Sequence, residues 1–225
     1  MPTHEPILLT VADKTYQARW DFCVNSQCVY AQRHQLRHVI HDEGAEGLNM
    51  LWSKLWYILH HLEKGQQVFY VDADVVITPS APHFGDEMDK TPEKSLFMAQ
   101  GISHRPNAGV MMARPTEIMK QFFRHVISRR QERMPPEDFV TETDDNGHII
   151  HFLKESRFAG LRQELPLTWN CSRPEVKGVY LYHFTNILRH YLETRWEFAE
   201  FENLPVKARM ARWDQVMNDL GVPRK

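Results

Sequence analysis

The sequence predicts an α/β fold built on a mixed, mainly parallel sheet, with a helical segment at its C-terminal end. Short apolar runs such as Ile7–Val11 and Val68–Val71 alternate with longer segments whose apolar residues recur at helical spacing. Strands that alternate with helices are typical of sheets in which helices connect parallel strands. The 225 residues are 42% hydrophobic and 25% charged, which suits one large domain with a substantial core.

The first elements follow directly from this pattern. Ile7–Val11 is expected to be a buried strand, and Asp13 to cap a helix that begins near Lys14 and continues to about His34. Further elements of this half are expected as a short strand within 36–40, a polar loop over 41–47, a helix over 48–62 that ends before Gly65, and a strand over 68–71.

The second half continues the alternation. Strands are expected over 95–99, 109–113 and 179–183, a helix over 116–129, a linker from Pro135-Pro136, and a helix or strand over 148–153. From residue 186 onward the chain is expected to be mostly helical. We therefore expect one domain over 1–185 and a helical C-terminal extension over 186–225 that packs on it.

Charge and cysteine content narrow the function classes. A net charge of −2 gives no electrostatic support for binding nucleic acid. Three cysteines without paired spacing indicate reduced thiols, which fit a cytoplasmic compartment. The first residues lack the features of a signal peptide, and no run approaches the ~18–20 apolar residues that span a bilayer. We expect a cytoplasmic protein without a transmembrane helix.

Asp72 and Asp74 form the motif that most strongly indicates a functional site. Asp72 and Asp74 follow the run Val68–Val71 and precede the apolar residues 75–77. In a continuing strand they would share one face and would repel each other unless a cation lay between them. Magnesium or manganese would satisfy them and leave positions open for substrate phosphates, and ligands of open α/β sheets bind at the carboxyl ends of strands. The alternative is two solvent-exposed aspartates that cap a strand or helix.

At this point the sequence resembles the nucleotide-sugar-dependent glycosyltransferases of GT-A (Rossmann-like) fold. It resembles above all the retaining group with the glycogenin-like, lipopolysaccharide galactosyltransferase-like and yeast and plant galactosyl/xylosyltransferase enzymes. The resemblance covers most of 7–185, and six segments besides Asp-x-Asp occur in the family's order. These are Thr10-Val11-Ala12-Asp13, Tyr30-Ala31-Gln32-Arg33-His34, Trp52-Ser53-Lys54-Leu55, Asn107-Ala108-Gly109-Val110-Met111, Leu165-Pro166-Leu167-Thr168-Trp169-Asn170 and Tyr182-His183-Phe184.

The resemblance implies a metal site and a nucleotide site. Asp72, Asp74 and His183 would hold the metal, with Ala73 between the aspartates, and residues Thr10, Val11, Ala12 and Asp13 would face the nucleobase. Imidazole as a third ligand favours manganese over magnesium. The alternative for His183 is a histidine at a strand end that bonds to backbone.

Further contacts to the donor are implied by the same segments. The amide of Asn107 would hydrogen-bond sugar hydroxyls, and Ala108 and Gly109 would let the backbone approach the sugar closely. The alternative is an ordinary turn into a strand. Lys54 and Arg33 are candidate contacts of the diphosphate, with a solvated helix face as the alternative for each.

The candidate catalytic carboxylates are Asp145 and its neighbour Asp144, with Asn107 beside the reacting sugar. Asp145 would stabilise an oxocarbenium-like centre or act as a nucleophile; the alternative is an N-cap for the segment 149–153. The family often has an unbroken helix here, whereas Asn146-Gly147 indicates a turn.

Together these residues predict a metal-dependent enzyme that moves a sugar from a nucleotide diphosphate to a hydroxyl of a glycan or glycoconjugate, with retention of configuration. An inverting enzyme would need a carboxylate base, a role open to Glu142, Asp144 or Asp145. One alternative is a haloacid-dehalogenase-like phosphatase with Asp72 as nucleophile, although that motif normally lies on the first strand. Another is a non-catalytic nucleotide-sugar-binding protein of the same fold.

The C-terminal segment carries one more expectation. Apolar residues recur at helical spacing beside basic ones, at Val206, Lys207, Arg209, Met210, Arg212, Trp213, Met217 and Leu220. Such a helix fits peripheral contact with a membrane that carries a lipid-linked saccharide acceptor. Packing on the domain is the alternative.

Overall fold

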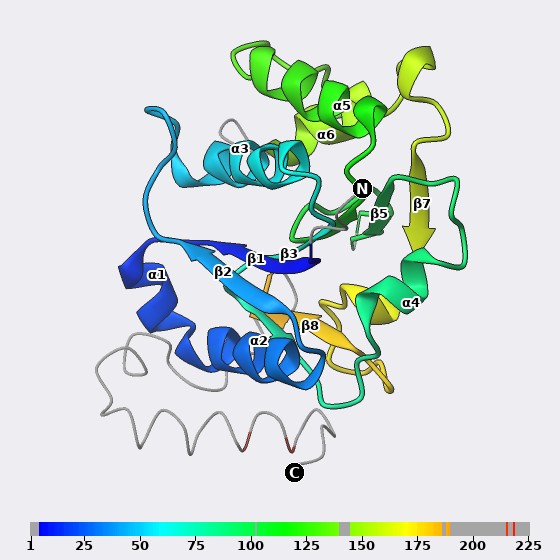
Figure 1. Cartoon of the computed structure of the whole chain (residues 1–225). Helices are drawn as coiled ribbons and strands as arrows, with labels where there is room; N and C mark the ends of the chain where they lie inside the picture. Colours follow the sequence, from blue (N-terminus) through cyan, green and yellow to red (C-terminus); the bar gives the residue numbers. More distant parts are fainter. Residues whose placement is uncertain are drawn as a thin grey trace.

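A central six-stranded sheet organises the molecule in the computed structural model, which describes residues 5–101, 103–139, 145–185, 188–189, 215 and 218 (Figure 1). The strand order is β2-β1-β3-β6-β5-β7, with bounds Arg37–His41, Ile7–Val11, Val68–Val71, Val110–Ala113, Leu96–Ala99 and Arg162–Leu165. Only β6 is antiparallel to its neighbours β3 and β5, whereas β1–β2, β1–β3 and β5–β7 are parallel. The predicted mixed, mainly parallel α/β sheet is confirmed.

A second, two-stranded sheet lies beside the first. It pairs β4 (Val75–Ile77) with β8 (Leu181–His183) in antiparallel register, so that Val75 lies opposite His183. The sequence predicted the late strand but not β4, since its three residues directly follow the Asp-x-Asp segment. This pairing brings β8 next to the aspartates that precede β4.

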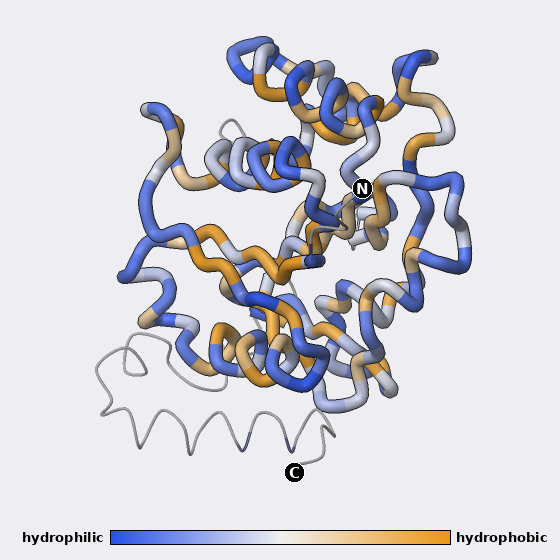
Figure 2. Tube along the Cα trace, viewed as in Figure 1, coloured by the Kyte–Doolittle hydropathy of each residue, from blue (hydrophilic) through white to orange (hydrophobic). Residues whose placement is uncertain are grey.

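Helices cover both faces of the central sheet (Figure 1). Helices α3 (Met50–Glu63), α5 (Glu117–Ser128) and α6 (Asp145–Phe152) lie on one face, and α2 (Asp21–Arg33) and α4 (Phe84–Met88) on the other. Successive strand residues alternate between the two layers: Leu9 packs with the core cluster of α3 and α5, and Leu8 with that of α2 and α4. Figure 2 shows the apolar strands between the more hydrophilic outer surfaces of the helices.

The expected helix from Lys14 to His34 is divided in two. Helix α1 (Lys14–Arg19) and α2 are separated at Trp20, which has φ −110° and ψ 30°. Trp20 is fully buried and stacks on Phe184, with ring centroids 5.5 Å apart. Burial of this indole anchors the break, and periodicity alone did not reveal it. The expected cap is confirmed, because the Asp13 carboxylate accepts the N–H of Tyr16.

Helix α6 corrects the turn expected at Asn146-Gly147, since both residues lie inside it. Asn146 uses its side chain to bind another segment: Oδ1 accepts the N–H of Ala108, and Nδ2 donates to the carbonyl of Pro106. Such tertiary contacts override the local turn preference of Asn-Gly. The segment 148–153, expected as helix or strand, is helical up to Phe152.

Two further elements, β7 and α4, were absent from the sequence prediction, as were the short 3₁₀ helices Ser156–Phe158 and Leu167–Trp169. Among the described residues, no helix combines the length and apolar character needed to cross a membrane. The expected extension 186–225, and with it the predicted membrane-contacting helix, falls almost wholly outside the described residues, so the boundary at residue 185 stays a prediction.

Candidate active site

A pocket of about 620 Å³ opens at the carboxyl ends of β1 and β3. Its lining brings together most of the predicted site residues: Val11, Ala12, Asp13, Lys54, Asp72, Ala73, Asp74, Asn107, Ala108, Gly109, Asp145 and His183. Thr10 does not line the pocket. It is fully buried, and its hydroxyl donates to Oε1 of Gln27 at 2.7 Å. Asp144 lies outside the described residues.

The two aspartates lie in a turn, and do not continue the strand as expected. Residues 72–74 fall between β3 and β4, and the N–H of Val75 donates to the carbonyl of Asp72 at 3.1 Å. The buried side chain of Gln27 holds this turn, because Nε2 donates to the carbonyls of both Asp72 and Val75 at 2.9 Å. The two carboxylates therefore come together because of a turn, and Gln27 of helix α2 holds that turn in place.

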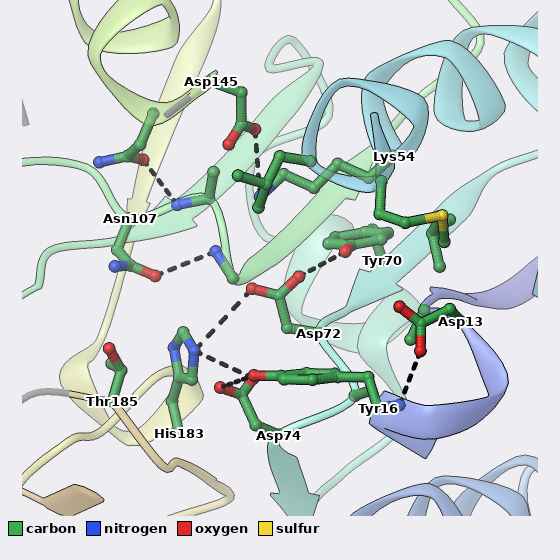
Figure 3. Close-up of a pocket in the computed structure, with 18 of the residues that line it drawn as sticks. Asp13, Tyr16, Lys54, Tyr70, Asp72, Asp74, Asn107, Asp145, His183 and Thr185 are labelled. Atoms are coloured by element: carbon green, nitrogen blue, oxygen red, sulfur yellow. Dashed lines mark hydrogen bonds and ion pairs between the residues drawn. The ribbon is translucent and has the colours of Figure 1, made fainter. Parts of the chain in front are cut away.

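Three donor atoms meet at the wall of the pocket (Figure 3). Nε2 of His183 lies 3.4 Å from Oδ1 of Asp74 and 3.9 Å from Oδ2 of Asp72, and ligand atoms of the three residues lie within 4.8 Å of one another. Two carboxylates and one imidazole form a donor set that suits a divalent first-row cation. Among the described residues they are the only such group of three.

A tyrosine holds each of the two carboxylates. The hydroxyl of Tyr70 donates to Oδ1 of Asp72, and that of Tyr16 donates to Oδ2 of Asp74 at 3.1 Å (Figure 3). Burial, followed by the charge of the aspartates, raises the pKa of both phenols, so both remain protonated donors. The oxygens that remain are those that face His183. No motif in the sequence marked either tyrosine as a site residue.

Gly109 leaves room for His183. A Cβ at position 109 would lie 2.1 Å from Cε1 of His183 and 3.0 Å from Oδ2 of Asp72. The β3–β6 pairing fixes the backbone there, since the N–H of Asp72 donates to the carbonyl of Gly109 at 2.8 Å. The absence of a side chain thus admits the imidazole itself, a reason that the sequence did not suggest.

Asp72, Asp74 and His183 shift one another's pKa values. Burial alone would lower the pKa of His183, but Asp74 and Asp72 outweigh it and raise that pKa. Burial alone would raise the pKa of Asp74, yet the neighbouring imidazole holds it below its ordinary value. Burial together with the charge of Asp74 keeps the pKa of Asp72 raised, against the opposing effect of Lys54. The two carboxylates of this group place negative charge at the pocket wall, which a bound cation would neutralise.

A buried ion pair forms another wall of the pocket. Nζ of Lys54, on α3, lies 3.1 Å from Oδ2 of Asp145, the first residue of α6, and both side chains are almost fully buried. Figure 3 shows this pair across the pocket from His183 and Asp74. Lys54 and the candidate catalytic carboxylate therefore fix each other's position.

Arg33, predicted as a diphosphate contact, does not line the pocket, whereas Arg189, for which the sequence suggested no role, does. Arg33 lies outside the pocket, where its guanidinium donates to the carbonyls of Pro79 and Ala81. Arg189 lines the pocket beside Tyr16 and Thr185, and no sequence motif marked it in advance. Its position after the late strand adds a second cation, besides Lys54, to the lining of the pocket.

Comparisons with known proteins agree with this geometry. Residues 3–171 match the model of the nucleotide-diphospho-sugar transferase family. No curated protein sequence matches the chain.

Solved structures share the fold. A glycosyltransferase involved in glycosylation of the major capsid of PBCV-1 has a TM-score of 0.63 at 14% identity, with 84% of this chain and 100% of that chain covered. The glycosyltransferase GlyE of Streptococcus pneumoniae TIGR4 has a TM-score of 0.59 at 11% identity, with 94% and 63% covered. The galactosyltransferase LgtC, solved with donor and acceptor sugar analogues, has a TM-score of 0.50 at 14% identity, with 90% and 98% covered.

The family match spans most of the chain and includes the Asp-x-Asp turn, which favours a transferase over the phosphatase and over a non-catalytic binding protein. The chain belongs to the nucleotide-diphospho-sugar transferase family and is a glycosyltransferase of GT-A fold.

Proposed function

We propose that this glycosyltransferase is metal-dependent and transfers a sugar, with retention, from a nucleotide diphosphate to a hydroxyl of a glycan or glycoconjugate. The convergence of Asp72, Asp74 and His183 at the wall of the 620 Å³ pocket supports the proposal most strongly. These three residues would hold the cation, and imidazole among its ligands favours manganese over magnesium. When bound, the cation neutralises charge on the leaving diphosphate.

The remaining lining residues would bind and orient the donor. Lys54 and Arg189 are the cations that line the pocket among the described residues, and both suit phosphate oxygens. Val11, Ala12 and Asp13 would border the nucleobase, and Asn107, Ala108 and Gly109 the sugar. Because positioning supplies much of the rate enhancement of group transfer, the fixed placement of these groups matters as much as their charge.

Asp145 is the candidate carboxylate at the sugar carbon. Its ion pair with Lys54 holds the carboxylate in place, which suits stabilisation of an oxocarbenium-like centre. Asp144 remains the alternative, and Asp144 or Glu142 would be the base of an inverting enzyme. Contact of the C-terminal segment with a membrane that carries a lipid-linked acceptor also remains part of the proposal.

A panel of nucleotide sugars tests this function. The protein is incubated with Mn²⁺ and each donor, and both thermal stabilisation and release of nucleotide diphosphate are measured. We expect stabilisation by one nucleotide class and slow hydrolysis of one donor, and both effects should disappear with EDTA. Cleavage of a generic phosphate ester without binding of any nucleotide diphosphate would refute the transferase.

Asp145→Asn tests the catalytic assignment. Loss of donor turnover with Mn²⁺ and nucleotide binding retained would support a role at the sugar carbon. Asp86→Asn is the matched control, because Asp86 is an exposed carboxylate outside the pocket. Turnover by Asp145→Asn equal to that of the wild type would contradict the assignment.

A further inference from the structure

Asn170 lies beside the candidate metal ligand His183, held there by backbone contacts. The N–H of His183 donates to the carbonyl of Cys171 at 2.8 Å, and the N–H of Cys171 donates to the carbonyl of Leu181 at 2.9 Å. The segment that follows the 3₁₀ helix Leu167–Trp169 therefore runs along β8. Asn170 and His183 are only 2% and 5% exposed, so their polar atoms must find partners within the protein.

A chain of hydrogen bonds fixes which atom of each side chain faces which. It begins at the N–H of Gly109, which can only donate and lies 3.0 Å from Asn107, so the Asn107 atom there is Oδ1. The Asn170 atom 2.9 Å from that oxygen must then be the donor Nδ2. The other end of the amide, Oδ1, consequently faces Nδ1 of His183 at 3.0 Å.

An amide oxygen only accepts, so Nδ1 of His183 must carry a hydrogen. In the neutral imidazole the lone pair then lies on Nε2, the atom that faces Asp72 and Asp74. We propose that Asn170 is a positioning residue that holds His183 in the Nδ1–H tautomer and so makes Nε2 a metal ligand. The inference rests on the proposed metal-binding role of His183, which the sequence resemblance implied without reference to a tautomer.

The opposite tautomer would let Nε2 donate to the carboxylate of Asp74, but it conflicts with the two amides and the N–H of Gly109. A hydrogen on Nε2 would block the metal position, and the bare Nδ1 would face the oxygen of Asn170. Rotation of the Asn170 amide would turn its oxygen toward Oδ1 of Asn107. Rotation of Asn107 as well would set its NH₂ group against the N–H of Gly109. The fixed backbone donor at Gly109 therefore controls the metal-facing nitrogen through two amides.

The tautomer can be read in the wild-type protein without metal. Long-range ¹H–¹⁵N NMR of the imidazole, recorded at a pH where His183 is neutral, distinguishes Nδ1–H from Nε2–H. The His183 signals are assigned by their absence from His183→Gln. We expect the Nδ1–H form in the wild type. A predominant Nε2–H form would overturn the inference and would leave the transferase function untouched.

Substitution of Asn170 adds a readout with Mn²⁺, titrated by the EPR signal of the free ion. Asn170→Leu removes the acceptor at similar volume, and we expect a mixed or Nε2–H tautomer and about 10- to 100-fold weaker Mn²⁺ binding. Asn170→Asp sets one oxygen against Oδ1 of Asn107 but keeps the other at Nδ1, so it should retain the Nδ1–H tautomer and bind Mn²⁺ more tightly than Asn170→Leu. Wild-type tautomer and affinity in folded Asn170→Leu would overturn the inference.

Gln66→Leu is the matched control. Oε1 of Gln66 lies 2.8 Å from Nδ1 of His61, an equivalent amide–imidazole pair outside the pocket. Its loss should leave Mn²⁺ affinity and the His183 tautomer unchanged. Absence of Mn²⁺ binding in the wild type, with the Nδ1–H tautomer present, would instead refute the proposed metal dependence, so the two failures are distinguishable.

Discussion

Gly109 is required by its neighbours and not by its backbone dihedral angles. The described glycines with positive φ are at other positions, Gly47, Gly65, Gly160 and Gly178. At position 109 the space for a Cβ is filled by Cε1 of His183, only 2.1 Å away. The metal-binding cluster therefore depends on the closeness of strand β6 to the imidazole.

Gly109→Ala should move His183 or Asp72 out of place. We expect a loss of about 1–3 kcal/mol in the free energy of unfolding, typical of overpacking, together with weaker Mn²⁺ binding. Urea unfolding and Mn²⁺ titration measure the two effects. Gly101→Ala, whose Cβ would meet nothing closer than 3.4 Å, should be near neutral. Wild-type Mn²⁺ affinity in Gly109→Ala would show that the imidazole is not confined.

Tyr16→Phe tests the role of the tyrosines that hold the carboxylates. It removes the hydrogen bond to Oδ2 of Asp74 and leaves the ring, so we expect about tenfold weaker Mn²⁺ binding. Tyr57→Phe is the control, because its hydroxyl bonds at 3.3 Å to the carbonyl of Glu43, away from the cluster. Equal Mn²⁺ affinity in both variants would contradict a supporting role for Tyr16.

Among single residues, those within recognisable motifs could be identified from the sequence, whereas the residues that hydrogen-bond to them could not. Asp72, Asp74 and His183 were found through Asp-x-Asp and the late His-Phe segment. Tyr16 and Tyr70 were interpreted as apolar helix and strand residues, since periodicity cannot distinguish a phenol that packs from one that donates. The one available signal for Tyr70 was its position two residues before Asp72 in the run Val68–Val71, since side chains two residues apart along an extended chain point to the same side.

Ion pairs connect helix α3 with helix α6, and the α6 region with the loop that precedes α6. Lys54 on α3 meets Asp145 on α6, and Asp138 in the preceding loop meets His151 and Lys154 of the α6 region. Each contact spans two elements, so each can be tested by a change in stability.

Lys54→Met removes the ammonium group that lies 3.1 Å from the buried carboxylate of Asp145. We expect a loss of about 3–5 kcal/mol in the free energy of unfolding, and the double variant Lys54→Met/Asp145→Asn should recover part of it. Denaturant unfolding of the wild type, the two single variants Lys54→Met and Asp145→Asn, and the double variant gives the coupling energy of the pair. Lys90→Met, which breaks an exposed pair with Glu87, should change stability little. Strictly additive losses would show that the pair is not coupled.

The lowered pKa of Asp138 makes the free energy of unfolding depend on pH. Desolvation alone would raise its pKa, but hydrogen bonds from Lys154 and His151 outweigh it and lower the pKa. Because the folded pKa lies below the unfolded value of about 3.9, the stabilisation is complete above that value and is lost as the pH falls through the folded pKa. The free energy of unfolding should therefore fall more steeply between about pH 5 and pH 2 in the wild type than in Asp138→Asn. Parallel curves would contradict this.

Elements with strong local signals were predicted, and those set by tertiary contacts were not. The buried strands β1 and β3 and the helices α3 and α5 follow from apolar runs and periodicity. Strand β7 has the sequence Arg-Gln-Glu-Leu, which lacks an apolar pattern because it forms an edge of the sheet. The break at Trp20 and the continuous helix through Asn146-Gly147 depend on contacts with distant segments, which no local pattern encodes.

The whole molecule brings distant segments to one edge of the sheet. The turn after β3, the start of β6, the first turn of α6 and the end of β8 meet at the pocket, although they lie far apart along the chain. The α/β class followed from the alternation of elements, and family membership from the order of the motifs. The second sheet, which carries His183 to Asp74, could not be predicted, because it depends on the pairing of β4 with β8.

One titration tests the central claim, that Asp72, Asp74 and His183 hold a divalent cation on which nucleotide binding depends. Mn²⁺ is titrated by EPR into the wild type, Asp74→Asn and Asp86→Asn, each with and without a nucleoside diphosphate. We predict one Mn²⁺ site in the wild type and in Asp86→Asn, tightened by the nucleotide, and none in Asp74→Asn. Nucleotide binding that is equally strong without cation, or an intact site in Asp74→Asn, would contradict the claim.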